Sequence, residues 1–110
     1  MNDNVYYPDV WVVVEFAGTA VPKTYQRVLA GWYGGYAGGD SWKLSSGVTE
    51  IIDRGSCWEI HNHSGSVYVC YKNSERFSML TGCIFSDMSQ SNSENIAVKQ
   101  VKLGGEDESP

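Results

Sequence analysis

The sequence has 110 residues, of which 42% are hydrophobic and 13% aromatic, a size and composition that suit one domain with one packed core. Charged residues make up 19%, below the roughly 25% typical of soluble domains, which excludes an intrinsically disordered chain. The formal net charge is −5, but three acids, Glu106, Asp107 and Glu108, lie beyond Gly104 and leave a nearly neutral body. We therefore expect a single β-rich domain over residues 1–103 and a mobile acidic tail over residues 104–110.

The distribution of basic and apolar residues excludes two kinds of partner. Lysines and arginines occur singly, without a basic patch, so we expect no direct DNA binding. No apolar run reaches the roughly 18 residues of a membrane span. The first four residues lack the basic start and apolar core of a signal peptide, which favours a cytoplasmic protein.

The first half of the chain predicts strands. Residues 10–16 are almost entirely β-branched and aromatic, which is typical of a strand covered on both faces. After a turn at residues 18–22, residues 24–30 alternate as a second strand. Residues 42–45 and 48–52 are extended segments separated by Ser46 and Gly47, and we expect one bent or bulged strand there.

A hairpin is predicted for residues 57–61 and 66–71, because the turn residues 62–65 separate two alternating segments. With all four turn residues in the loop, Trp58 faces Val69 and Ile60 faces Val67 in the core beside Val12 and Val14. The same register places Cys57 opposite Cys70.

The remainder predicts one short helix and a last strand. Asn73 or Ser74 can cap one or two helical turns that carry Phe77 and Leu80 and end at Gly82. We expect a brief strand at residues 83–85, a polar loop at 86–95 and a strand at 96–103. These spacings indicate a mainly β protein, a single-domain antiparallel β-barrel or sandwich with one short helix.

A stretch rich in glycine and aromatic residues, 29–47, is the most biased part of the sequence. Its glycine spacing matches neither the Rossmann nor the P-loop pattern, so it predicts a wide turn or bulges, or else a cradle that holds a nucleotide-like ligand by stacking. We assign Trp32 and Trp42 to packing beneath the loop. The candidate binding residues are Tyr33, Gly34, Gly35, Tyr36 and Asp40.

Metal binding and catalysis have weaker support. Cys57, Cys70 and His61 fall on one face of the predicted hairpin, yet the chain lacks the C-x-x-C and H-x-x-x-H spacings of zinc sites, so we expect free thiols, no metal and no cofactor. His61 and His63 are the only imidazoles, and no G-x-S-x-G motif is present. Two carboxylate pairs, Asp40 with Glu50 and Asp53 with Glu59, are interpreted as surface acids on turns. We expect no catalytic residues.

Segments 29–36, 40–47 and 64–68, which read LAGWYGGY, DSWKLSSG and SGSVY, resemble short accessory proteins of unassigned function from tailed bacteriophages. The resemblance implies work in the host bacterial cytoplasm. One hypothesis is a binding protein that blocks a host macromolecule, such as a component of antiviral defence, through the glycine and aromatic surface. The alternatives are a module that sequesters a nucleotide or another small molecule by stacking, and an enzyme of unknown type. Open sheet edges are compatible with a homodimer.

Overall fold

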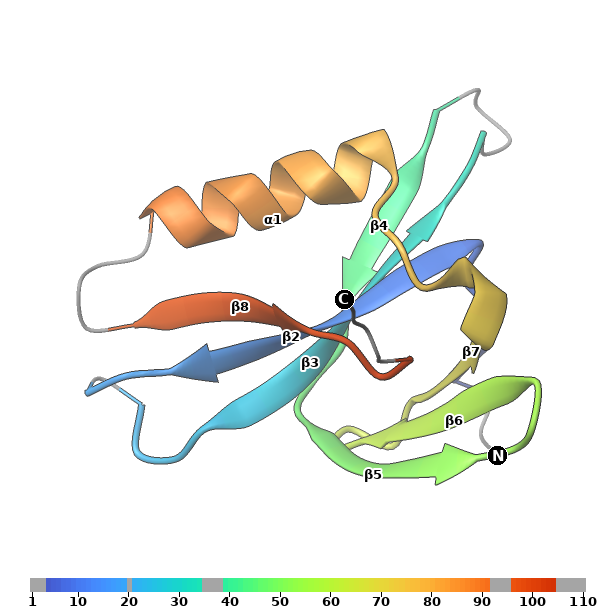
Figure 1. Ribbon diagram of the computed structural model, residues 1–110, viewed down its shortest axis with the longest axis horizontal. Helices are drawn as coiled ribbons and strands as arrows, with labels where there is room; N and C mark the ends of the chain where they lie inside the picture. The colour runs from blue at the N-terminus through green and yellow to red at the C-terminus, as the bar shows by residue number, and fades with distance from the viewer. Residues whose placement is uncertain (1–3, 20, 35–38, 92–95, 105–110) are drawn as a thin grey trace, which may run out of the picture.

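The computed structural model describes residues 4–19, 21–34, 39–91 and 96–104, which form two sheets and one α-helix (Figure 1). The central sheet has the strand order β4-β3-β2-β8, and the outer sheet has the order β1-β7-β6-β5. The strands of the central sheet are β2 (Val10–Ala17), β3 (Tyr25–Trp32), β4 (Ser41–Leu44) and β8 (Ala97–Val101). Those of the outer sheet are β1 (Val5–Tyr6), β5 (Val48–Asp53), β6 (Cys57–Asn62) and β7 (Val67–Tyr71).

The protein is mainly β, as predicted, and its sheets pack as a sandwich without closing into a barrel. All strand pairs are antiparallel except β1 with β7, which is parallel. Within the described residues, no helix is long and apolar enough to cross a membrane.

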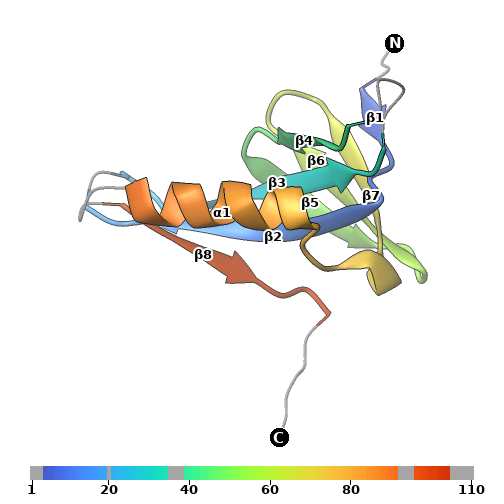
Figure 2. The same cartoon turned by 90° about the horizontal axis from the view of Figure 1, so that it is seen from above.

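The central sheet is the middle of three layers, because the outer sheet covers one face and the helix α1 (Met79–Ser91) covers the other (Figure 1). Seen from above, α1 lies over β2 and β3 (Figure 2). Strand β2 contributes to both cores. Trp11 and Val13 pack with Ile60 and Tyr68 of the outer sheet, whereas Val12, Val14 and Phe16 pack beneath α1. The predicted double coverage of residues 10–16 is confirmed, but Val12 and Val14 belong to the helix-side core rather than to the hairpin core.

Residues 42–52 do not form one bent strand. β4 pairs with β3 in the central sheet, whereas β5 pairs with β6 in the outer sheet, so the chain changes sheets at residues 45–47. Ser45 is 2% exposed at this crossing and its hydroxyl oxygen accepts a hydrogen bond from the Val28 N–H at 2.7 Å. A separate irregularity, which was not predicted, lies inside β5, where the register with β6 shifts between Val48 and Glu50.

The predicted hairpin is present, but its register differs by one residue. Trp58 lies opposite Cys70 and Ile60 lies opposite Tyr68. Asn62 and Ser66 close the loop: the Asn62 N–H donates to the Ser66 carbonyl at 3.0 Å, and Gly65 adopts a φ of +97°. This is the three-residue loop with a left-handed glycine that hairpins commonly use.

Because side chains alternate between faces, the shift of one residue exchanges the faces of β7. Tyr68 and Cys70 are buried in the core, and Val67 and Val69 turn outward and are only half-buried. The prediction that Cys57 faces Cys70 is also wrong, since Cys57 lies opposite Tyr71.

The helical region is longer than predicted. Residues 72–74 form one turn of 3-10 helix, and α1 then runs through Gly82, the predicted strand at 83–85 and most of the predicted loop. Ser78, rather than Asn73 or Ser74, caps α1: its N–H donates to Thr81 Oγ1 at 2.8 Å, and the Thr81 N–H donates to Ser78 Oγ at 3.1 Å. The apolar side chains that pack on the helix-side core are Phe77, Ile84, Phe85 and Met88.

Candidate functional site

The described part of the glycine and aromatic stretch is fixed by two carboxylates. The N–H of Gly34 donates to Asp40 Oδ1, and the N–H of Tyr33 donates to Asp9 Oδ2, both at 2.8 Å. Gly34 has a φ of +49°, a conformation that glycine adopts without strain. The structure thus brings Tyr33, Gly34 and Asp40 together, whereas the other predicted binding residues, Gly35 and Tyr36, lie outside the described residues.

These contacts bear on the predicted ligand cradle. A cradle of that kind uses backbone N–H groups to hold the negative charge of a ligand. The N–H groups of Tyr33 and Gly34 already donate to the protein's own carboxylates, which would also repel an anion. The arrangement favours a loop braced from within that displays its side chains.

Three aromatic side chains are exposed on neighbouring segments at this end of the central sheet, and we call them the aromatic surface: Tyr7 is 58%, Tyr33 48% and Trp42 43% exposed. Trp32 is half-buried against the core of the outer sheet, and its indole N–H donates to the Tyr7 carbonyl at 3.1 Å. The assignment of Trp32 to packing is therefore confirmed. The same assignment for Trp42 is wrong, because Trp42 stands on the edge strand β4, on the face that carries α1.

Gly31 has a structural role in the same stretch. A Cβ atom at this position would lie 2.8 Å from Thr81 Cγ2 and 3.1 Å from a methyl group of Val10. Glycine therefore allows the first turn of α1 to lie directly on β3, which fixes the position of β3 and β4 beside the start of the helix (Figure 1).

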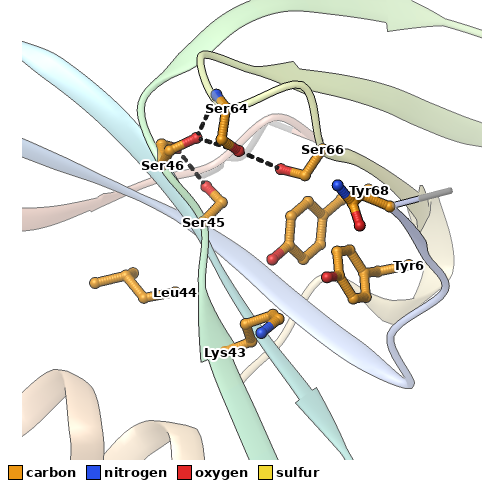
Figure 3. A pocket seen from close by; sticks show the side chains of 9 residues that line it. Tyr6, Lys43, Leu44, Ser45, Ser46, Ser64, Ser66 and Tyr68 are labelled. Atoms are coloured by element: carbon orange, nitrogen blue, oxygen red, sulfur yellow. Dashed lines mark hydrogen bonds between the residues drawn. The ribbon is translucent and has the colours of Figure 1, made fainter. Parts of the chain in front are cut away.

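A polar pocket of about 240 Å³ opens where β4 passes the outer sheet (Figure 3). Tyr6 and Tyr68 form one wall, with their rings stacked at a centroid distance of 4.9 Å. Lys43 faces them from β4, and its Nζ lies 5.4 Å from the centre of the Tyr6 ring. The pocket also contacts Asn4 and Leu44, and four serines complete its lining: Ser45, Ser46, Ser64 and Ser66.

The serine hydroxyls form a connected series at one side of the pocket (Figure 3). Ser46 Oγ accepts from the Ser64 N–H at 3.0 Å and donates to Ser64 Oγ at 3.0 Å, and Ser64 Oγ donates to Ser66 Oγ at 3.3 Å. Ser66 Oγ also accepts from Asn62 Nδ2 at 3.1 Å. The series joins the crossing between the sheets to the hairpin loop and closes that side of the pocket.

Burial raises the pKa of Tyr68 from 10.0 to about 12, with a smaller effect from the neighbouring Tyr6. The Tyr68 phenol therefore remains a neutral O–H donor across the physiological range. Within the described residues, neither Tyr6 nor Tyr68 hydrogen bonds to another protein group through its hydroxyl. Both hydroxyls point toward the side of the pocket where Lys43 lies (Figure 3).

The cysteine and histidine residues do not gather into a metal site. The observed register places Cys57 and His61 on the outward face of β6, whereas Cys70 is buried on the inward face of β7. In the described ranges, no group of three or more His, Cys, Asp or Glu side chains is arranged to hold a metal ion. Burial also raises the pKa of the Cys70 thiol, which keeps it protonated.

Of the other titratable candidates, Asp53 and Glu59 form ion pairs on the outer sheet. Glu59 accepts a hydrogen bond from Arg54 Nε at 2.7 Å and lies 2.6 Å from His61 Nε2, and these two contacts lower the pKa of its carboxyl group, Arg54 most. A hydrogen bond from Lys72 at 2.7 Å lowers the pKa of Asp53 in the same way. Within the described residues, neither His61 nor His63 hydrogen bonds to a serine or cysteine side chain.

Sequence reasoning missed Tyr7 and the pocket. The alternation of Ser66, Tyr68 and Cys70 carries a signal for the pocket, because residues two apart share a face of a strand. The predicted four-residue loop hid this signal, because its register placed Ser66, Tyr68 and Cys70 on the outward face of the hairpin. The contribution of Tyr6 carries no local signal, since β1 pairs with a strand about 60 positions further along the chain.

Comparison of the sequence with models of known families, with curated proteins and with solved structures finds no significant match.

Proposed function

We propose that this protein is a non-enzymatic binding protein that attaches to a macromolecule of a bacterial host and blocks it, with the aromatic surface as the principal contact. The observation that carries the proposal is the exposure of Tyr7, Tyr33 and Trp42 on adjoining segments. Tyrosine and tryptophan are enriched among the residues that dominate binding energy in protein interfaces. The bacterial host as the source of the partner comes from the resemblance to phage accessory proteins.

The bracing of the loop supports this role. Asp9 and Asp40 hold the backbone of Tyr33 and Gly34, so less conformational entropy is lost when a partner binds there. Met79 at the start of α1 is also large and exposed, at 87%. Methionine adapts its shape to a partner, and it would extend the contact toward the helix.

The alternative is a module that sequesters a nucleotide by stacking on these aromatic rings. It has less support, because the nearby N–H groups that would hold phosphate charge donate to carboxylates instead. A panel of nucleotides tests it directly: a ligand that binds only the folded state raises the melting temperature by mass action. Stabilisation by a nucleotide that Tyr33→Ala abolishes would replace the first proposal with this one.

The decisive experiment compares the recovery of bacterial proteins by the unaltered protein and by Tyr33→Ala and Trp42→Ala. Both positions are exposed, so we expect each variant to lose under about 1 kcal/mol of unfolding free energy. We expect each to weaken the interaction with the partner by about 2 kcal/mol if it anchors the interface.

Tyr71→Ala is the matched control, because Tyr71 is 42% exposed but lies on the outward face of β7. A partner lost by the two variants and retained by the control supports the proposal. A partner retained by both variants, or lost equally by all three, would contradict it.

A further inference from the structure

We propose that the pocket between β4 and the strands β1 and β7 binds a phosphate-type oxyanion, either inorganic phosphate or a small phosphomonoester. This site is separate from the aromatic surface and does not depend on the function proposed above. Its volume of about 240 Å³ lies just below the roughly 300–1,000 Å³ of pockets for drug-sized ligands, so it suits a small molecule or one end of a larger one.

The first argument for an anionic ligand is the charge of the residues that line the pocket. Among the residues that the structure describes, the pocket is lined by one ammonium group, that of Lys43, and by hydroxyl, amide and apolar groups, without an aspartate or glutamate. The chain as a whole has a net charge of −5, so a pocket of this composition differs from its surroundings. An anion is the ligand that such a lining favours.

The second argument is the direction of the hydrogen bonds among the hydroxyl groups of the pocket. Ser66 Oγ accepts from both Ser64 Oγ and Asn62 Nδ2, so its own proton is left to donate. Within the described residues that proton has no protein acceptor. The hydroxyl protons of Tyr6 and Tyr68 also have no acceptor among the described residues. Three O–H donors and one ammonium group are therefore available to a ligand.

Four donors favour a ligand that accepts through several oxygens. A carboxylate has two oxygens, whereas a phosphate group has at least three that are free to accept. Tyr68 is 1% exposed and its phenol stays protonated, so it is a fixed donor at the base of the site. Charge-assisted hydrogen bonds from Lys43 would supply most of the affinity, and the hydroxyls would select for the tetrahedral group.

The test is a titration followed by residue-resolved amide NMR, with sodium phosphate, glycerol phosphate and sodium acetate added separately at constant ionic strength. Melting temperatures alone are insufficient, because phosphate salts stabilise many proteins by exclusion from their surface. We expect saturable shifts at the amides of Ser46, Ser64 and Ser66, with a Kd for phosphate on the order of 1 mM. Tighter binding of glycerol phosphate than of phosphate would identify a phosphomonoester as the ligand, and weaker binding would identify the inorganic ion.

Two variants of pocket residues and one control complete the test. Lys43→Gln, at an exposed position of β4, should weaken phosphate binding by about tenfold or more, as the loss of a charge-assisted hydrogen bond does. Tyr68→Phe should weaken it by a smaller factor, and Lys102→Gln, an exposed lysine beyond β8, should leave it unchanged. Shifts that do not saturate, acetate binding as tight as phosphate binding, or equal effects of Lys43→Gln and Lys102→Gln would each overturn the proposal.

Discussion

At the scale of single residues, Gly31 decides how closely the helix and the central sheet approach. The nearest atom to a Cβ at this position would be a methyl carbon of Thr81, at 2.8 Å, a distance that real Cβ contacts essentially never show. The glycine therefore serves packing rather than a turn, unlike Gly34, whose positive φ belongs to the loop.

We expect Gly31→Ala to lower the free energy of unfolding by about 1–3 kcal/mol, the usual range for overpacking a core. Thr81→Ser removes the obstructing methyl group and keeps the hydroxyl that takes part in the helix cap, so Gly31→Ala should cost less in that background. Chemical denaturation of the four proteins in this cycle measures the coupling. Equal costs in both backgrounds would show that Thr81 is not the obstacle, and Gly47→Ala, with open space around its Cβ, is the control.

Tyr68 gives the protein a specific response to alkaline pH. The unfolded chain releases the phenol proton near pH 10.0, whereas the folded protein holds it to about pH 12. Between these values the unfolded state binds fewer protons, so stability falls as the pH rises. Tyr68→Phe should therefore show a shallower decline of unfolding free energy over this range. Tyr33→Phe, at an exposed position, is the control, and identical slopes for both variants would contradict the assignment.

At the scale of elements, the helix cap and the hairpin loop show how short polar contacts select the secondary structure. Ser78 begins α1 with a reciprocal pair of hydrogen bonds to Thr81, in a capping box where threonine stands in the usual place of glutamate or glutamine. Asn62 begins the hairpin loop with side-chain bonds to both the carbonyl and the hydroxyl of Ser66, each at 3.1 Å.

We expect Ser78→Ala to destabilise the protein by about 0.5–2 kcal/mol, the range for the loss of an N-cap side chain. Ser86→Ala, at an exposed position inside the same helix, should have an effect within about 0.5 kcal/mol, because it removes no cap. Thermal and urea denaturation would measure both. A cost for Ser86→Ala equal to that for Ser78→Ala would contradict the capping role, because alanine has a higher helix propensity than serine and Ser86 makes no cap.

The strands could be predicted from the sequence because their signal is local. Residues 10–16 and 24–30 are rich in β-branched, aromatic or alternating apolar residues, and these side chains pack on both faces of the central sheet. The length of α1 could not be predicted from the sequence, because Gly82 and the serines around it have weak helix propensity. The helix is stabilised instead by contacts of Ile84, Phe85 and Met88 with a sheet that is distant in the sequence. The hairpin was predicted and its register was not, since one hydrogen-bonded asparagine decides between a three-residue and a four-residue loop. The exposure of Trp42 was not predicted, because it depends on β4 being an edge strand, which the local pattern does not reveal.

At the scale of the whole molecule, Trp11 joins the two sheets. It is fully buried on β2, and its indole N–H donates to the carbonyl of Tyr71, at the end of β7, at 2.8 Å. The same tryptophan packs with Ile60, Tyr68 and Cys70 in the core between the sheets. The sandwich therefore depends on one side chain both for apolar contact and for a polar connection between its layers.

We expect Trp11→Phe to cost about 1–3 kcal/mol, because it leaves a smaller ring and removes the donor to the Tyr71 carbonyl. Trp11→Ala should cost about 3–5 kcal/mol. Urea denaturation followed by circular dichroism would measure both variants, and Trp42→Phe, on an exposed edge, is the control. A loss below about 0.5 kcal/mol for Trp11→Phe, the level of ordinary surface substitutions, would contradict this role.

The strand β1 is two residues long, and it is attached to the outer sheet by its pairing with β7 and by the bond from the Val67 N–H to the Asn4 carbonyl at 2.9 Å. We expect an element this small to open more often than the sheet that carries it, and each opening would remove Tyr6 from the pocket wall. Occupancy of the pocket and closure of β1 are therefore thermodynamically linked, each favouring the other by the same free energy. A bound oxyanion should accordingly slow hydrogen exchange at the amides that β1 and β7 share, while leaving exchange in β2 and β3 unchanged.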